Sequence, residues 1–153
     1  MLRIGILGCG RIGQVHARTI AGMANACVQA VADAMPEAAA SLADACNTQV
    51  RGTGDILAAT DIDAVVIGTP TDTHFDLIHT AARAGKAIFC EKPIDMSVEN
   101  IRACIQVVET AGVTFLTGFN RRFDPSFAAL RARIAAGDIG DPELVTITSR
   151  DPA

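Results

Sequence analysis

The chain has 153 residues, of which 50% are hydrophobic and 20% are charged, and its formal net charge is −4. This length and apolar content suit one compact domain with a core of its own. The scattered charges form no basic face for nucleic acid, and no apolar run is long enough to cross a membrane. We therefore expect neither nucleic acid nor a membrane as a partner.

The cysteines indicate the compartment. Cys9, Cys27, Cys46, Cys90 and Cys104 are odd in number, widely spaced and include no CxxC pair. With three histidines and no metal-ligand spacing, we expect no metal site. Reduced thiols favour a cytoplasmic location, and the short apolar run at the N-terminus does not resemble a signal peptide.

Apolar, strand-like runs alternate with helical periodicity over the first 118 residues. Strands are expected at residues 3–7, 27–32, 49–51, 64–68, 87–90 and 114–117, the third being weak. Helices are expected at residues 11–22 and 36–46, from an Asp72 cap to before Gly85, and from a Ser97 cap to Gly112. In this last helix Val98, Ile101, Ile105 and Val108 are expected to line one face. The alternation predicts βαβ units and an α/β fold: a Rossmann doubly wound parallel sheet.

The remaining residues do not continue this pattern. A helix is expected to begin at Asp124-Pro125, present Phe127, Leu130 and Ile134 as an apolar stripe, and stop at Gly137. Residues 143–148 (ELVTIT) read as a strand, which we expect to pair within its own domain or with a neighbouring copy of the chain. The prediction is a dinucleotide-binding domain over 1–118 and the truncated start of a second α+β domain over 119–153.

The segment RIGILGCGRIG, at residues 3–13, contains the most informative motif. An apolar strand runs into Gly8-x-Gly10-x-x-Gly13 and then into a helix. Gly8 permits the tight turn, Gly10 lets the backbone approach a pyrophosphate, and Gly13 lets the helix pack on the strand. The first N–H groups of that helix, around Arg11 and Ile12, would face the phosphates. The alternative is a plain glycine turn in an unrelated α/β protein.

Asp33 follows the last glycine by twenty positions, at the end of the second expected strand. Its carboxylate would accept hydrogen bonds from the ribose hydroxyls of the adenosine. It would also repel the 2′-phosphate of NADP, and Ala34 and Met35 follow where an NADP enzyme would usually place Arg or Ser. The expected cofactor is therefore NAD.

The loop after the fourth strand, from Gly68 to His74, lies where open α/β sheets bind ligands. Thr69, Thr71 and backbone groups of this loop are candidate cofactor contacts, although the same loop also reads as a proline turn with Asp72 as a helix cap. His74 is a candidate contact as well, or simply a first-turn helix residue.

Glu91-Lys92-Pro93 follows the fifth strand. Lys92 is one of only two lysines, the other being Lys86, and its ammonium could hydrogen-bond a substrate hydroxyl as hydride leaves the carbon. Glu91 could hold the lysine, and a cis Lys92-Pro93 bond could aim it. The alternative is a solvated Glu-Lys pair.

Asn120 lies in the segment GFNRRF after the sixth strand and could touch nicotinamide or substrate. Arg121 and Arg122 are read mainly as partners in ion pairs at a domain interface. His16 is expected to be an ordinary helix residue near the cofactor, and His79 a structural residue in the middle of its helix.

Four motifs together resemble the Gfo/Idh/MocA family of NAD(P)-dependent sugar and polyol oxidoreductases: GILGCGRIG, TPTDTH, EKP and GFNRRFDPSF. The later residues, GFNRRFDPSFAALRARIAAGDIG and VTITSRDPA, look most like the inositol 2-dehydrogenases of that family. The resemblance implies hydride transfer from a secondary alcohol of inositol to NAD. It also implies a polyol substrate and a homo-oligomer.

The resemblance also implies roles for individual residues. Lys92 is the expected catalytic residue, in contact with the nicotinamide ribose and the substrate hydroxyl. The expected cofactor-binding residues are Gly8, Gly10, Arg11, Ile12, Gly13, Asp33, Thr69, Pro70, Thr71, His74, Glu91, Lys92 and Asn120. Family members are about twice as long, with a second domain that supplies an aspartate and a general-base histidine. We therefore expect this chain alone to turn over poorly or not at all.

Two alternatives remain open at this stage. The chain could be a non-catalytic NAD-binding or regulatory module, although such a module has no need of Lys92. It could also belong to a dehydrogenase for another sugar or polyol.

Overall fold

The chain divides into two compact units, Met1–Gly118 and the residues from Phe119 onward. The computed structural model describes residues 1–150. No helix within these residues is long and apolar enough to cross a membrane.

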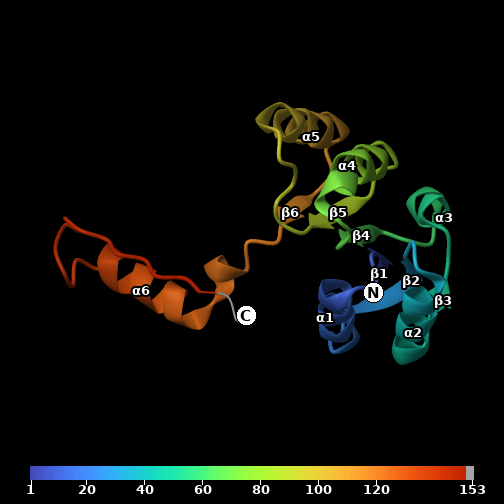
Figure 1. Cartoon of the computed structure of the whole chain (residues 1–153), viewed down its shortest axis with the longest axis horizontal. Coiled ribbons are helices and arrows are strands. Elements are labelled where there is room, and N and C mark those ends of the chain that lie inside the picture. The colour runs from blue at the N-terminus through green and yellow to red at the C-terminus, as the bar shows by residue number, and fades with distance from the viewer. Residues whose placement is uncertain (151–153) are drawn as a thin grey trace. The chain divides into compact units, whose positions relative to one another are not determined.

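A six-stranded parallel sheet forms the frame of the first unit (Figure 1). Its strands are β1 (Leu2–Leu7), β2 (Ala26–Ala32), β3 (Gln49–Val50), β4 (Ala64–Ile67), β5 (Ala87–Cys90) and β6 (Phe115–Thr117). Their order in space is β3-β2-β1-β4-β5-β6, and every neighbouring pair is parallel. The strand order reverses between β1 and β4, which confirms the predicted doubly wound Rossmann sheet.

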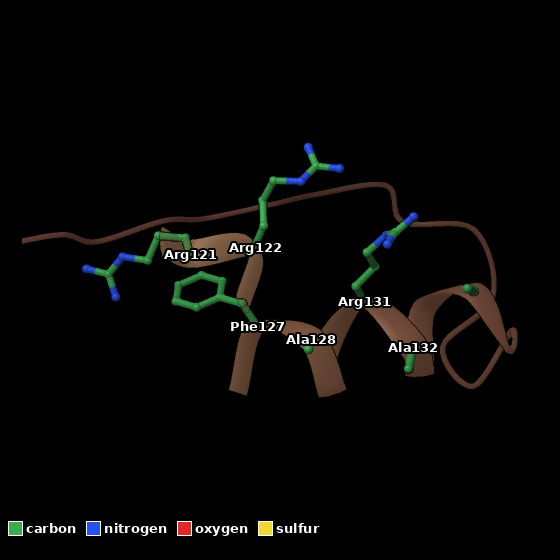
Figure 2. Close-up of a pocket in the computed structure, with 7 residues that line it drawn as sticks. Arg121, Arg122, Phe127, Ala128, Arg131 and Ala132 are labelled. Atoms are coloured by element: carbon green, nitrogen blue, oxygen red, sulfur yellow. The ribbon is translucent and has the colours of Figure 1, made fainter. Parts of the chain in front are cut away.

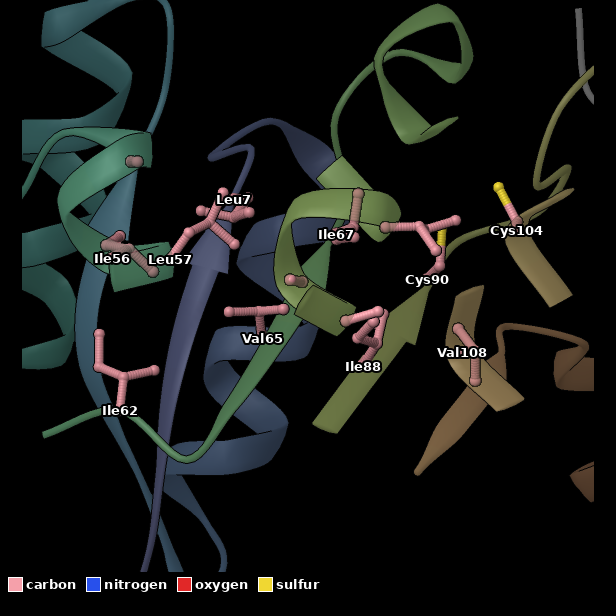
Figure 3. Close-up of a cluster of buried hydrophobic side chains, with 14 of the residues drawn as sticks. Leu7, Ile56, Leu57, Ile62, Val65, Ile67, Ile88, Cys90, Cys104 and Val108 are labelled. Atoms are coloured by element: carbon pink, nitrogen blue, oxygen red, sulfur yellow. The ribbon is translucent and has the colours of Figure 1, made fainter. Parts of the chain in front are cut away.

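Helices cover both faces of the sheet. They are α1 (Arg11–Ala21), α2 (Pro36–Cys46), α3 (Thr53–Ala58), α4 (His74–Arg83) and α5 (Val98–Ala111). One buried cluster joins the sheet to α3, α4 and α5 through residues such as Ile56, Ile78 and Cys104. Figure 3 shows part of this cluster, with Ile56 and Cys104 labelled. The other joins the opposite face to α1 and α2 through residues such as Ile20 and Leu42. Because both faces are covered, every residue of β4 is buried.

Two details of the expected helices were wrong. Asp72 caps no helix: a 3₁₀ turn, Thr71–Thr73, comes first, and Thr73 occupies the N-cap position of α4 without a capping hydrogen bond from its side chain. In α5, Val98 and Ile105 are exposed, and the residues that pack into the core are Cys104 and Val108. Cysteine packs here as a small apolar residue, which a count of aliphatic positions overlooks. The Ser97 cap is confirmed, because its side chain accepts from the Asn100 N–H.

Helix α3 was not predicted from the sequence. Its six residues are too few to show helical periodicity and include Gly54, yet Ile56 and Leu57 are buried. The helix is stabilised by this packing rather than by the intrinsic propensity of its residues.

Lys86 is a structural lysine at the start of β5. It is 6% exposed, and its Nζ donates to the backbone carbonyls of Ala59 and, at 2.7 Å, Ile62. The charge is therefore solvated by two carbonyl oxygens of the segment that leads into β4. This position separates it from Lys92, which is exposed after the other end of β5.

Arg3 of β1 and Asp63, which directly precedes β4, form a bidentate ion pair. The Arg3 Nη2 and Nε atoms lie 2.7 and 3.0 Å from the two carboxylate oxygens of Asp63. The hydrogen bond from Arg3 lowers the pKa of the Asp63 carboxyl well below its usual range.

The second unit contains a 3₁₀ turn, Asn120–Phe123, and α6 (Pro125–Ala135). The predicted helix start is confirmed, because the Asp124 side chain accepts from the N–H groups of Ser126 and Phe127. The predicted apolar stripe exists but is uncovered, and Leu130 is 55% exposed. Residues 143–148 form no strand and pair with no other segment of residues 1–150. The expected strand is thus not formed within the described residues, where its backbone groups find no partner, and its pairing with a neighbouring copy stays a prediction.

Candidate functional site: a dinucleotide edge of the sheet

The glycine turn joins β1 to α1 in a conformation that other residues would not tolerate. Gly8 has φ +96°, and a Cβ at Gly13 would lie 1.9 Å from the Gly8 carbonyl oxygen. A Cβ at Gly8 would in turn lie 2.6 Å from the carbonyl oxygen of Gly68. The turn therefore packs tightly against α1 and against the loop after β4. Gly10 differs, because a Cβ there would meet no atom within 4 Å, so its outer side is open to a ligand.

The N-terminus of α1 has the features of an anion-binding site. Its N-cap, Gly10, is extended, and no side chain caps the helix. The first N–H groups of α1, beginning at Arg11 and Ile12, are those that an α-helix leaves unpaired. Both residues are exposed, and the helix dipole adds a positive potential. This arrangement fits the pyrophosphate of a dinucleotide.

Asp33, just after β2, lies beside the glycine turn. Its Oδ2 accepts from the Cys9 N–H at 2.6 Å, and its Oδ1 accepts from the Met35 N–H at 2.8 Å. These bonds fix the carboxylate, while its partial exposure leaves lone pairs for ribose hydroxyls. The carboxylate is thus oriented toward the turn by the backbone of that turn.

Cys9 sits inside the glycine turn but carries no reactive thiol. Its side chain is buried, and burial raises the pKa of the thiol to about 11. The nearby Asp33 carboxylate acts in the same direction. The thiol therefore stays protonated near neutral pH and serves as a small packing group.

The loop after β4 is tied down by hydrogen bonds of its own. The Thr73 hydroxyl lies 2.6 Å from the Thr69 hydroxyl and 2.7 Å from the Pro70 carbonyl oxygen. His74 is 1% exposed, and its Nε2 and Nδ1 lie 2.9 Å from the carbonyl oxygens of Thr69 and Pro93. His74 therefore connects the loop after β4 to the loop after β5 through its two ring nitrogens. Its direct contact with a cofactor stays a prediction.

Glu91, Lys92 and Pro93 follow β5, next to β4 in the sheet. The Lys92-Pro93 bond is cis, as expected. Glu91 does not pair with the Lys92 ammonium. Its Oε2 accepts from the Lys92 N–H at 3.3 Å, and its Oε1 lies 2.8 Å from His16 Nε2. The side chain of Lys92 is exposed and available to a substrate.

His16 is the residue of this edge whose contact the sequence did not reveal. It lies in α1, and its partner Glu91 is 75 positions away. No local pattern signals such a pair, because the contact arises only when α1 packs against the sheet.

The structure brings together the candidates that follow β1, β2, β4 and β5, because parallel strands end at one edge. Asn120 belongs to the second unit, in the turn Asn120–Phe123, and its contact with the cofactor stays a prediction. The second unit has a hollow of its own, lined by Arg121, Arg122 and Arg131 (Figure 2). The Arg121 guanidinium carbon lies 5.3 Å from the centre of the Phe127 ring.

The fold and this edge define a dinucleotide-binding domain of the Rossmann type. Residues 2–119 match the Gfo/Idh/MocA family, described as "Oxidoreductase family, NAD-binding Rossmann fold". The chain belongs to this family, and the family's description confirms the predicted cofactor, NAD.

The relatives narrow the comparison. The chain is 59% identical over 152 residues to inositol 2-dehydrogenase of Rhizobium meliloti, a match that covers 99% of this chain and 46% of that protein. A solved scyllo-inositol dehydrogenase from Lactobacillus casei, with bound NAD(H) and scyllo-inositol, is 34% identical at a TM-score of 0.87, covering 92% of this chain and 43% of that one. A myo-inositol dehydrogenase from Corynebacterium glutamicum is 45% identical at a TM-score of 0.83, with the same coverage. The chain thus spans about half the length of these relatives.

Proposed function

We propose that this chain is the cofactor-binding half of an NAD-dependent dehydrogenase that oxidises a secondary alcohol of an inositol. The observation that carries the proposal is the placement of Lys92 on the same sheet edge as the glycine turn and Asp33. A pure binding module needs the turn and the acid but has no use for an exposed lysine beside them. The 59% identity to an inositol 2-dehydrogenase supports inositol as the substrate.

The residues divide the work of binding. The open side of Gly10 and the N-terminus of α1 would hold the pyrophosphate, and Asp33 would hold the adenosine ribose. The same carboxylate would repel a 2′-phosphate, so NAD is favoured over NADP. Thr69, Pro70 and Thr71 would border the cofactor from the loop after β4.

Lys92 would carry the chemistry contributed by this half. Bound NAD supplies the hydride acceptor. The Lys92 ammonium would donate a hydrogen bond to the substrate hydroxyl oxygen and orient the carbon that loses hydride. The hydroxyl proton would pass to a base contributed by the rest of the whole protein.

The proposal extends to the whole protein. Residues from Phe119 onward would open the substrate domain, with Asn120 near the crevice, and the exposed apolar residues of this unit would face further parts of the protein or a second copy in a homo-oligomer. The five unpaired cysteines support a cytoplasmic location.

A chimera tests the proposal. Residues 1–118 of this chain replace the corresponding segment of the Rhizobium meliloti enzyme, and NADH formation is followed with a panel of inositols and other polyols. We expect inositol oxidation that is lost in the matched Lys92→Met chimera. NAD binding without any turnover would favour a non-catalytic module.

A further inference from the structure

His16 makes a specific contact with the segment that carries Lys92. Its Nε2 lies 2.8 Å from Glu91 Oε1, and both side chains are largely buried, at 21% and 15% exposure. The ring also packs edge-on against Phe89 of β5, with 4.8 Å between ring centres. Two independent contacts therefore fix the orientation of the imidazole against the end of β5.

The surroundings of Glu91 accommodate its carboxylate in this position. A Cβ at Gly118, just after β6, would lie 3.0 Å from Glu91 Oε2 and 3.1 Å from Oε1, so the glycine leaves room for the carboxylate. The second oxygen accepts from the Lys92 N–H at 3.3 Å. The carboxylate is thus held between α1, the end of β6 and the backbone of its neighbour.

The contact between His16 and Glu91 affects the charge partner of Lys92. Glu91 and Lys92 are adjacent in sequence, and a Glu91 carboxylate without another partner would attract the Lys92 ammonium. Over residues 1–150, the Lys92 ammonium has no carboxylate partner within ion-pair distance. The competing carboxylate is already bound to His16.

We propose that His16 is a positioning residue, which binds the carboxylate of Glu91 and so keeps that carboxylate off the ammonium of Lys92. The inference rests on the proposed function, because it takes Lys92 as the group that meets the substrate. His16 also ties the helix that begins at the glycine turn to the loop that carries Lys92. The geometry of the pyrophosphate end and that of the reacting end are therefore linked by one hydrogen bond.

Acetylation of the chain with a trace of acetic anhydride tests the proposal, because only Lys86, Lys92 and the N-terminus carry amines. Only an uncharged amine reacts, and a nearby carboxylate favours the charged form. His16→Leu, which releases Glu91, should slow acetylation of Lys92 roughly threefold or more relative to the N-terminus. His16→Gln, whose amide nitrogen can reach the same oxygen, should react like the unchanged chain. The double variant His16→Leu with Glu91→Gln should recover the original rate, because the released group is then neutral.

The outcomes separate a positioning role from a structural one. A folded His16→Leu chain with an unchanged Lys92 rate would overturn the proposal, and so would a double variant that stays slow. Rapid acetylation of buried Lys86 would reveal unfolding, in which case His16→Met, with an unbranched side chain against Phe89, takes the place of His16→Leu. NAD titration of the unchanged chain runs in parallel. Absence of NAD binding would contradict the proposed function. The acetylation rates would still decide whether His16 holds Glu91 away from Lys92.

Discussion

Substitution by alanine should lower the stability of the chain at Gly13 but hardly change it at Gly10, although both glycines lie in the same turn. At Gly13 the new Cβ would lie 1.9 Å from the Gly8 carbonyl oxygen, whereas real Cβ contacts do not fall below 3.0 Å. The turn and α1 must therefore separate by about 1 Å, and such overpacking costs about 3 kcal/mol. For a chain of this size, that corresponds to a loss of about 6–12 °C in Tm. At Gly10 the Cβ meets no protein atom within 4 Å, so stability should hardly change.

The affinity for NAD should respond to the alanine substitution at Gly10. A methyl group at Gly10 occupies the open side where the pyrophosphate would approach, and we expect NAD affinity to fall about tenfold or more, which is about 1.4 kcal/mol. Gly54→Ala, in α3 and equally free of close neighbours, is the matched control and should leave NAD binding unchanged. Thermal unfolding and calorimetric NAD titration of the three variants provide the test. Equal stability of the Gly13 and Gly10 variants would contradict the close packing at Gly13, and full NAD affinity of the Gly10 variant would contradict the pyrophosphate site.

Three further substitutions, with Lys92→Met as the control for the first, test contacts that hold the sheet and its loops together. Lys86→Met removes the donor to two buried carbonyls and should cost about 2 kcal/mol in urea unfolding, whereas Lys92→Met should cost nothing measurable. His74→Phe should lower stability by about 2 kcal/mol and also weaken NAD binding, because the loops after β4 and β5 lose the imidazole that contacts both of them; unchanged values in both assays would contradict this. Arg3 lowers the pKa of Asp63 in the folded chain, so the stabilisation is present above the ordinary carboxyl pKa and is lost as pH falls through the folded value. Between pH 5 and pH 2, Asp63→Asn should therefore show a shallower fall in unfolding free energy than the unchanged chain, and an equal slope would exclude the pair.

The doubly wound sheet could be predicted because each strand and each covering helix carries its own local signal. Gly8, Gly13 and Asp33 likewise stand in a short, ordered pattern, and the structure places them at one edge. The contact between His16 and Glu91 could not be predicted, because it depends on how α1 packs against β5.

The errors have physical causes of the same kind. Residues 143–148 have the composition of a strand, but composition does not supply the partner that a strand needs. Asp72 has the chemistry of a cap, yet the 3₁₀ turn that begins after Pro70 moves the start of α4 to His74. In both cases a neighbouring segment, rather than the residue itself, decided the outcome.

Calorimetric titration of the chain with NAD, and with NADP as the comparison, is the decisive test of NAD binding at this sheet edge. We expect saturable binding of NAD, with NADP at least about tenfold weaker because the Asp33 carboxylate, held beside the glycine turn, would repel the 2′-phosphate. Asp33→Ala should narrow that difference. No binding of either dinucleotide, or equal binding of both, would contradict the assignment of this sheet edge to NAD.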